Sequence, residues 1–229
     1  MTGRAAPRLP QLGTRLSRIA ELVPRCEMAA DIGADHGKLS CNLLHSGRVN
    51  RMIVSDIGRS SRAKARDLFI RHGLIDRVII SGADGLRALS EKVDAVIIAG
   101  MGGELIARIL AQDVDLQGAS LILSAQTELP LVRAAILKRG YRIDKEALTR
   151  ENGRFYRIIT SSPGQQELNE FELALGVNIE ETAEASLFDF ITWQLDVSKT
   201  WRGARGDAWR KHLKEALDAH KTDHSTNSP

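Results

Sequence analysis

The amino-acid sequence predicts an α/β protein, with an open, mostly parallel sheet covered by helices, a closing antiparallel hairpin and a small helical extension. Three observations predict this fold. Short apolar runs alternate with helical patterns over residues 28–139, glycines follow most of these helices, and two β-like runs flank an Asn-Gly turn after Gly140. Strand-helix alternation of this kind gives parallel strands whose faces the intervening helices cover.

The first element is an amphipathic helix ended by Pro24, because Leu12, Leu16, Ile19 and Leu22 or Val23 recur at helical spacing. Buried strands are expected at the apolar runs Met28–Ile32, Met52–Ser55, Val78–Ser81, Ala95–Ala99 and Ser120–Leu123. Helices are expected at His36–Ser46, Ser60–His72, Gly103–Ala111 and Leu129–Arg139, with Gly47, Gly73 and Gly140 as their C-terminal stops.

A hairpin follows, in which Tyr141–Leu148 and Phe155–Thr160 flank the turn at residues 151–154. A parallel sheet closed by such a hairpin is the Rossmann-like architecture of class I methyltransferases, although a Rossmann dehydrogenase shares its first half. From Gln165 onward the pattern is helical. We therefore predict a domain at residues 1–162 and a helical C-terminal extension at 163–229, with a polar, irregular tail from His220.

Composition agrees with one sizeable core and an appendage, since the 229 residues are 43% hydrophobic and 27% charged. The N-terminal stretch has no apolar region typical of a signal peptide, and no apolar run is long enough to span a membrane. We therefore expect a cytoplasmic protein without membrane contact. Cys26 and Cys41 lack the spacing of a metal site, so reduced thiols and no bound metal are expected. The sequence leaves the oligomeric state open.

Charge is distributed unevenly along the chain, although the net charge is only +3. Between Arg133 and Arg157 there are eight Lys or Arg residues and three acids, whereas Gln165 to Asp196 contains eight acids and no Lys or Arg. A basic surface of this kind can follow a phosphate backbone. Solvated helix faces are the other interpretation.

Ligands of open α/β sheets bind at the carboxyl ends of the strands, which directs attention to the segment Asp31-Ile32-Gly33-Ala34-Asp35-His36-Gly37. Its glycines let the backbone approach a ligand at a helix N-terminus. A dinucleotide fingerprint needs a second glycine where Asp35 stands, and a carboxylate there repels a pyrophosphate. S-adenosylmethionine has an ammonium and a sulfonium but no phosphate. The segment therefore favours S-adenosylmethionine over NAD.

Three further strand ends carry candidate cofactor contacts. Asp56 can accept hydrogen bonds from ribose hydroxyls or can cap the next helix. In Gly82-Ala83-Asp84-Gly85, Asp84 can accept from the adenine amino group, or the segment is a simple turn. Ala99-Gly100-Met101-Gly102-Gly103 can wall the transferable methyl group, or it is only a tight strand-to-helix turn.

The sequences of these motifs resemble those of a known family. The segments at 31–37, Gly82-Ala83-Asp84-Gly85-Leu86 and Ile98-Ala99-Gly100-Met101-Gly102-Gly103 are together similar to the bacterial tRNA (adenine-N1)-methyltransferases that act at tRNA position 22. The similarity runs from Arg15-Leu16 to the segment 151–156, and the helical extension of that family fits the remainder.

The resemblance implies tRNA as partner, S-adenosylmethionine as cofactor and Asp35 as the catalytic residue. The implied cofactor-binding residues are Arg15, Asp31, Gly33, Asp35, His36, Asp56, Ile57, Asp84, Gly85, Ala99, Gly100, Met101 and Gly102. Adenine N1 has a lone pair and needs no strong base, so positioning and electrostatics supply most of the acceleration. Asp35 can stabilise the charge that develops on the methylated base, or it can bind the cofactor ammonium. His36 can act as acid or base, or cap a helix.

Two segments depart from the family pattern. Lys38-Leu39-Ser40 stands where an aromatic residue, Leu and Pro are usual, and Ser124-Ala125-Gln126 stands where Gln-Pro-Asn is usual. Both segments are candidates for acceptor contact, and loss of the aromatic residue weakens a platform for stacking an extruded base; Lys38 can instead meet a phosphate. The alternatives are a methyltransferase acting on another RNA position, a small molecule or a protein, and a non-catalytic RNA-binding module.

Overall fold

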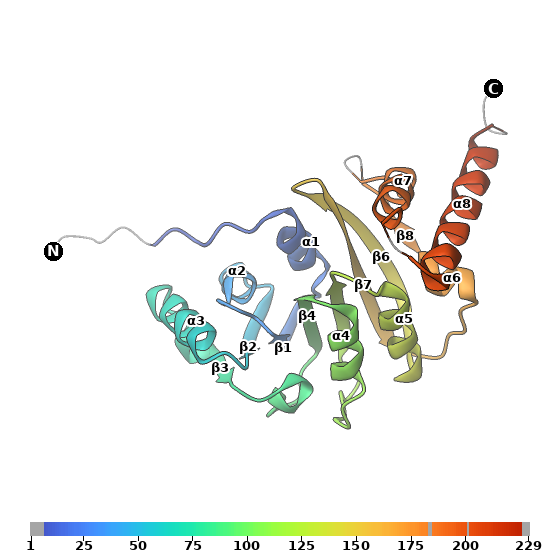
Figure 1. Cartoon of the computed structure of the whole chain (residues 1–229). Helices are drawn as coiled ribbons and strands as arrows, with labels where there is room; N and C mark the ends of the chain where they lie inside the picture. The colour runs from blue at the N-terminus through green and yellow to red at the C-terminus, as the bar shows by residue number, and fades with distance from the viewer. Residues whose placement is uncertain (1–6, 183–184, 201, 226–229) are drawn as a thin grey trace.

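The computed structural model describes residues 7–182, 185–200 and 202–225, and its strands form one sheet in the order β3-β2-β1-β4-β5-β7-β6-β8 (Figure 1). The strands are β1 (Cys26–Ile32), β2 (Val49–Ser55), β3 (Val78–Ser81), β4 (Ala95–Met101), β5 (Ser120–Ala125), β6 (Tyr141–Glu151), β7 (Arg154–Pro163) and β8 (Ile179–Glu180). Strands β1 to β5 are parallel, and β7 runs antiparallel to β5 and β6. The strand order reverses between β1 and β4, where α/β sheets bind ligands.

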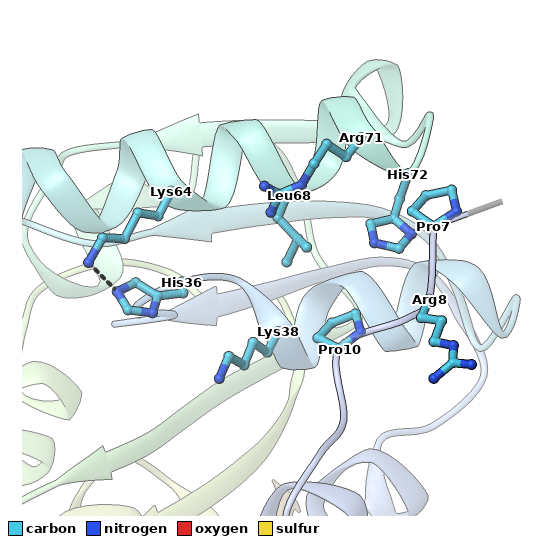
Figure 2. Close-up of a pocket in the computed structure, with 9 residues that line it drawn as sticks. All are labelled: Pro7, Arg8, Pro10, His36, Lys38, Lys64, Leu68, Arg71 and His72. Atoms are coloured by element: carbon cyan, nitrogen blue, oxygen red, sulfur yellow. Dashed lines mark hydrogen bonds between the residues drawn. The ribbon is translucent and has the colours of Figure 1, made fainter. Parts of the chain in front are cut away.

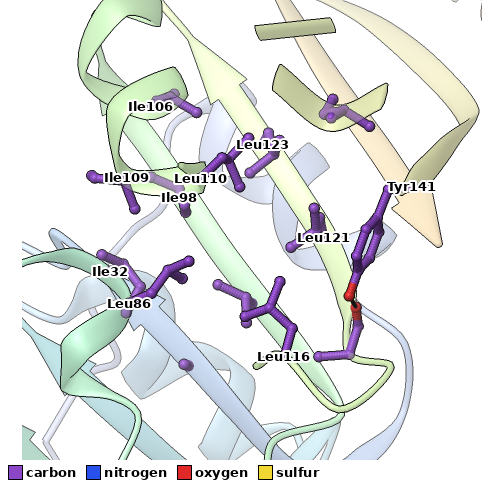
Figure 3. Close-up of a cluster of buried hydrophobic side chains, with 14 of the residues drawn as sticks. Ile32, Leu86, Ile98, Ile106, Ile109, Leu110, Leu116, Leu121, Leu123 and Tyr141 are labelled. Atoms are coloured by element: carbon purple, nitrogen blue, oxygen red, sulfur yellow. Dashed lines mark hydrogen bonds between the residues drawn. The ribbon is translucent and has the colours of Figure 1, made fainter. Parts of the chain in front are cut away.

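Helices cover both faces of the parallel strands and bury a separate apolar cluster on each. Helices α1 (Thr14–Leu22), α2 (Lys38–His45) and α3 (Arg59–Arg71) pack on one face. Helices α4 (Gly103–Leu110) and α5 (Leu129–Lys138) and the 3-10 turn η2 (Gly85–Ala88) pack on the other, and a second 3-10 turn, η1 (Ile75–Arg77), precedes β3. Figure 3 shows the second cluster, where Ile106 and Ile109 of α4 face Ile98 and Leu123, and the Tyr141 hydroxyl donates to the Ala119 carbonyl at 2.9 Å.

The predicted parallel strands and helices are confirmed, with shifts of a few residues at their ends. The hairpin is also confirmed. Asn152 and Gly153 both have positive φ (49° and 77°), as the two central residues of a type I′ turn require. Strand β4 passes the predicted end at Ala99 and reaches Met101 through a register shift at Gly100, so this glycine lies in a bulge of the strand.

The C-terminal extension contains α6 (Glu170–Leu175), α7 (Leu187–Ser198) and α8 (Ala204–Ser225), as its helical pattern predicts. Two features differ. The short strand β8 pairs in parallel with β6, and two residues are too few for a recognisable alternation. Helix α8 continues to Ser225, so the irregular tail predicted from His220 is wrong for residues 220–225; residues 226–229 lie outside the described residues.

A buried charge network joins the hairpin to the extension. Glu146 accepts two hydrogen bonds from Arg133 (2.7 and 2.8 Å) and one from Arg157 (3.1 Å), and Arg133 also donates to the Leu173 and Ala174 carbonyls. Burial acts to raise the pKa of Glu146, but the two guanidinium groups outweigh it and hold that pKa below its usual value. Two cations of the predicted basic stretch are therefore buried and paired with Glu146 rather than available to a phosphate backbone.

A third apolar cluster reinforces this junction. Leu148 and Phe155 of the hairpin pack with Phe190 and Ile191 of α7 and Leu213 of α8. The division at residue 162 stays a prediction. Among the described residues, no helix combines the length and the apolar character needed to cross a membrane.

Candidate cofactor and acceptor site

The carboxyl ends of β1 to β4 bring the predicted site residues to one edge of the sheet. Ile32 at the end of β1 pairs with Ser55 of β2 and with Ile98 of β4, and Ser55 pairs with Ser81 of β3. The segments that follow these positions therefore start side by side. All the predicted contacts except Arg15 belong to these segments or to the last residues of the strands.

Asp31 is the buried carboxylate of this edge. It is 4% exposed, and the Ser40 hydroxyl donates to its Oδ2 at 2.6 Å. Burial raises the pKa of Asp31 to about 6; the Ser40 hydrogen bond acts against this rise, and the nearby charge of Asp56 adds to it. Asp31 thus ionises close to neutral pH, which makes its charge sensitive to any cation bound beside it.

Two glycines keep the backbone open where β1 and β4 end. Gly33 has φ of 73° and Gly100 has φ of 80°, a region that glycine adopts without strain. The Met101 side chain lies over Gly33, so that a Cβ there would overlap the Met101 Cε. Met101 of β4 therefore lies directly beside the Gly33 backbone of the neighbouring strand end.

Asp35 and Asp56 hold the loops after β1 and β2 together. The Asp35 backbone N–H donates to Asp56 Oδ2 at 3.1 Å, and Asp56 Oδ1 accepts from the Gly58 N–H at 2.7 Å. Gly58, not Asp56, is the N-cap of α3. The Asp35 side chain is 70% exposed, with Oδ1 3.4 Å from the Nε2 of His36. The candidate catalytic carboxylate is thus held by its backbone and open to an incoming substrate.

His36 does not cap a helix, because Gly37 is the N-cap of α2. Its Nε2 lies 3.2 Å from the Nζ of Lys64 and faces the Asp35 carboxylate. His36 therefore connects the exposed acid to a cation of α3.

An apolar side chain and a guanidinium lie at the end of β2. Ile57 is 74% exposed, an unusual position for a large aliphatic residue. Arg62, which the sequence patterns do not single out, donates to the carbonyls of Asp56 and Ile57 at 2.7 and 2.9 Å. Arg62 thereby fixes the backbone that presents both residues.

The loop after β3 is held by Gln112. Its Oε1 accepts from the Leu86 N–H at 2.7 Å and leaves no room for a Cβ at Gly85, which has φ of 60°. Asp84 is exposed, and its Oδ2 lies 3.8 Å from the Nη1 of Arg87. The Asp84 carboxylate is therefore exposed, like that of Asp35 and unlike that of Asp31.

Arg15 reaches the same edge from α1. A Cβ at Gly100 would lie 3.6 Å from its Nη1, and its guanidinium stacks on Tyr156 with 5.2 Å between the guanidinium carbon and the ring centroid. The Nε and Nη1 of Arg15 are buried and have no hydrogen-bond partner within the described part of the chain. Glu151 accepts from the Arg15 backbone N–H at 3.3 Å. The hairpin tip is thus a wall of the site.

The two segments that depart from the family pattern contribute differently from what the sequence suggests. Leu39 and Ser40 are buried, so neither can contact an acceptor, and only Lys38 of that segment is exposed. Ser124 is buried, and its hydroxyl has no hydrogen-bond partner among the residues that the structure describes, whereas Gln126 is exposed. The accessible differences therefore reduce to Lys38 and Gln126.

Comparison with known proteins identifies the family. A family model described as a methyltransferase domain matches residues 12–159. A tRNA (adenine(22)-N(1))-methyltransferase of Bacillus subtilis is 31% identical over 160 residues, which are 69% of this chain and 67% of the relative. The chain belongs to the tRNA (adenine(22)-N1)-methyltransferase family.

Solved structures extend the likeness to the C-terminal part of the chain. A candidate tRNA (m1A22) methyltransferase of Streptococcus pneumoniae, crystallised with S-adenosyl-L-methionine, is 27% identical with a TM-score of 0.75 and covers 89% of this chain and 98% of its own. M. capricolum TrmK, in complex with S-adenosylhomocysteine, is 20% identical with a TM-score of 0.77 and covers 90% and 98%. The predicted family resemblance and fold class are confirmed.

Proposed function

We propose that this protein transfers a methyl group from S-adenosylmethionine to N1 of adenine 22 in tRNA. The observation that carries the proposal is the convergence of Asp31, Asp56, Gly33 and Gly100 at the carboxyl edge of the sheet. The Arg15 guanidinium lies beside them, and its Nε and Nη1 have no hydrogen-bond partner among the described residues. The B. subtilis relative bears the name of this activity, which supports the choice of acceptor.

The chemistry of these residues fits the cofactor. S-adenosylmethionine has an ammonium, a carboxylate, two ribose hydroxyls and an adenine ring. Asp31 offers a buried carboxylate for the ammonium, and Arg15 offers buried donors for the carboxylate. Asp56 can accept from ribose hydroxyls, and the exposed Ile57 offers an apolar surface for adenine. We assign these roles as part of the proposal.

Bound S-adenosylmethionine supplies an electrophilic methyl group, and adenine N1 already has a lone pair to accept it. No side chain has to remove a proton before transfer, so the protein contributes positioning and electrostatic stabilisation. We assign Asp35 to the acceptor, because its exposed carboxylate can face the cation that forms on the methylated base. The opposite charge stabilises the product-like transition state.

The proposal includes tRNA as the macromolecular partner and a reaction in the cytoplasm. It also includes a supporting role for the extension formed by α6, α7 and α8 in holding tRNA. Of the exposed cations of the hairpin, Arg142 pairs with Asp144 and Lys145 with Glu180. Arg150 and Arg154 form no ion pair within the described residues and are available for this role.

The test uses the full chain with S-adenosylmethionine and a tRNA transcript carrying adenine at position 22. Digestion to nucleosides and mass spectrometry should detect 1-methyladenosine, and a matched transcript with guanine at position 22 should yield none. Product from both transcripts would assign a different RNA position. Cofactor binding by calorimetry without RNA methylation would favour a methyltransferase that acts on a small molecule or a protein. Absence of cofactor binding would exclude methyltransferase activity on any of these acceptors.

A further inference from the structure

A hollow of about 440 Å³ lies between α2, α3 and the N-terminal segment, next to the site (Figure 2). Its charged and titratable lining residues are Arg8, His36, Lys38, Lys64, Arg71 and His72. Lys64 and Arg71 come from α3, Lys38 begins α2, and Arg8 precedes α1. No acidic residue is among the described residues that line it, and three separate elements bring positive charge to one concave surface.

The cations of this hollow are not paired with acidic side chains, unlike several cations elsewhere in the described structure. Arg18 pairs with Glu180 and Arg51 with Glu91, and the buried Arg133 pairs with Glu146. Within residues 7–182, 185–200 and 202–225, none of the four Lys and Arg residues of the hollow forms an ion pair. Like charges gathered without acids repel one another, and a concave surface concentrates their field on an incoming anion.

The hollow is continuous with the candidate acceptor site. His36 lines it, and His36 Nε2 lies 3.4 Å from the carboxylate of Asp35. Lys64 points across from α3 toward His36, as Figure 2 shows. An anion bound in the hollow is therefore one residue away from the group assigned to the acceptor base.

We propose that this hollow binds backbone phosphates of the tRNA beside the target nucleotide. Enzymes that modify a base take it out of the stack, and contacts to the backbone fix its position without reading sequence. The volume exceeds that of a single phosphate group, and flexible Lys and Arg side chains suit a stretch of phosphodiester. This inference rests on the proposed function.

The test compares two triple variants of the full chain that remove the same charge. The variant K38Q/K64Q/R71Q replaces three of the four Lys and Arg side chains that line the hollow with neutral ones. R66Q/K92Q/R108Q removes three exposed cations that do not line it, including one from α3. Binding of the tRNA transcript is measured by fluorescence anisotropy at several salt concentrations, S-adenosylhomocysteine binding by calorimetry, and methylation by nucleoside analysis.

The hollow variant should bind tRNA about tenfold more weakly at 0.1 M salt, and its slope of log affinity against log salt should fall by about 2, because each phosphate contact contributes about 0.7–0.9. The control variant should retain the wild-type slope, and both variants should retain S-adenosylhomocysteine affinity. Equal losses in the two variants, or none in either, would overturn the proposed phosphate site. Loss of tRNA affinity in the hollow variant alone, with wild-type protein that forms no 1-methyladenosine, would refute the proposed function and leave the phosphate site standing.

Discussion

Replacing Ser40 with Ala should shift the pH dependence of cofactor binding toward higher pH. Ser40 is fully buried, and its hydroxyl donates to Asp31 Oδ2 at 2.6 Å. That hydrogen bond favours the ionised carboxylate and holds its pKa at about 6, below the value that burial alone would give. Removal of the hydroxyl therefore raises the pKa of Asp31.

The magnitude follows from the strength of a hydrogen bond to a charged group, about 1.5–3 kcal/mol, and from about 1.4 kcal/mol for each pKa unit. The pKa of Asp31 in the variant should lie about 1–2 units higher. The ammonium of S-adenosylhomocysteine requires ionised Asp31, so affinity is complete above the pKa and falls about tenfold for each pH unit below it. At pH 6.5 the variant should therefore bind about 3- to 25-fold more weakly than wild type, and the two proteins should converge near pH 8.5.

Isothermal titration calorimetry with S-adenosylhomocysteine between pH 5 and 8.5 measures both midpoints. Ser161→Ala is the matched control, because Ser161 is buried in β7 and its hydroxyl has no hydrogen-bond partner in the described part of the chain. Its midpoint should equal that of wild type. Identical midpoints in Ser40→Ala and wild type would refute the argument that ionisation of Asp31 controls binding.

Three further changes test the site and its support. Gly33→Ala should lower S-adenosylhomocysteine affinity at least about tenfold in calorimetry, because its methyl group displaces the flexible end of the Met101 side chain from its place over Gly33. Gly47→Ala, with similar φ and open surroundings, should cost about 1 kcal/mol of stability and no affinity. Asp35→Asn should reduce the turnover of tRNA methylation about 10²- to 10³-fold with little change in cofactor affinity, because Asn tolerates positive φ but has no charge. Glu146→Gln should lower the free energy of unfolding in urea by about 3–5 kcal/mol, because it leaves two buried guanidinium groups uncompensated.

Each of these changes has a contradicting result. Equal affinity losses in the two glycine variants would remove Met101 from the explanation. Parallel losses of turnover and of cofactor affinity in Asp35→Asn would reassign this acid to the cofactor. The exposed control is Glu167→Gln. If its free energy of unfolding lies within about 1 kcal/mol of that of Glu146→Gln, the buried network does not stabilise the fold as argued.

The parallel half of the fold could be predicted from sequence because each strand is a short apolar run bounded by glycine or an acid. Gly47, Gly73 and Gly140 all have positive φ, which explains why they end helices. Strand β8 could not be predicted, because its pairing with β6 depends on a partner more than thirty residues away. Local patterns carry no information about such a contact.

The candidate site was predictable where one strand end supplies both the backbone and the side chain, as at Asp31 and Asp56. Contacts between elements were not. Ser40 reads as a departure from the family pattern, yet it is the hydrogen-bond partner of Asp31. Tyr156 lies on the hairpin and stacks on Arg15 of α1, a meeting that no spacing in the sequence encodes.

Strand β6 connects the cofactor edge to the C-terminal extension. At its end, Glu151 accepts from the Arg15 backbone N–H, and five positions earlier Glu146 accepts from Arg133 and Arg157. Arg133 also donates to two carbonyls of α6. A buried ion network seldom stabilises a protein more than a well-packed apolar core of the same volume. Its specific hydrogen bonds instead fix one register between the hairpin and the extension. Because Arg15 contacts the tip of that hairpin, the register that the network selects also sets where the Arg15 guanidinium meets the cofactor edge.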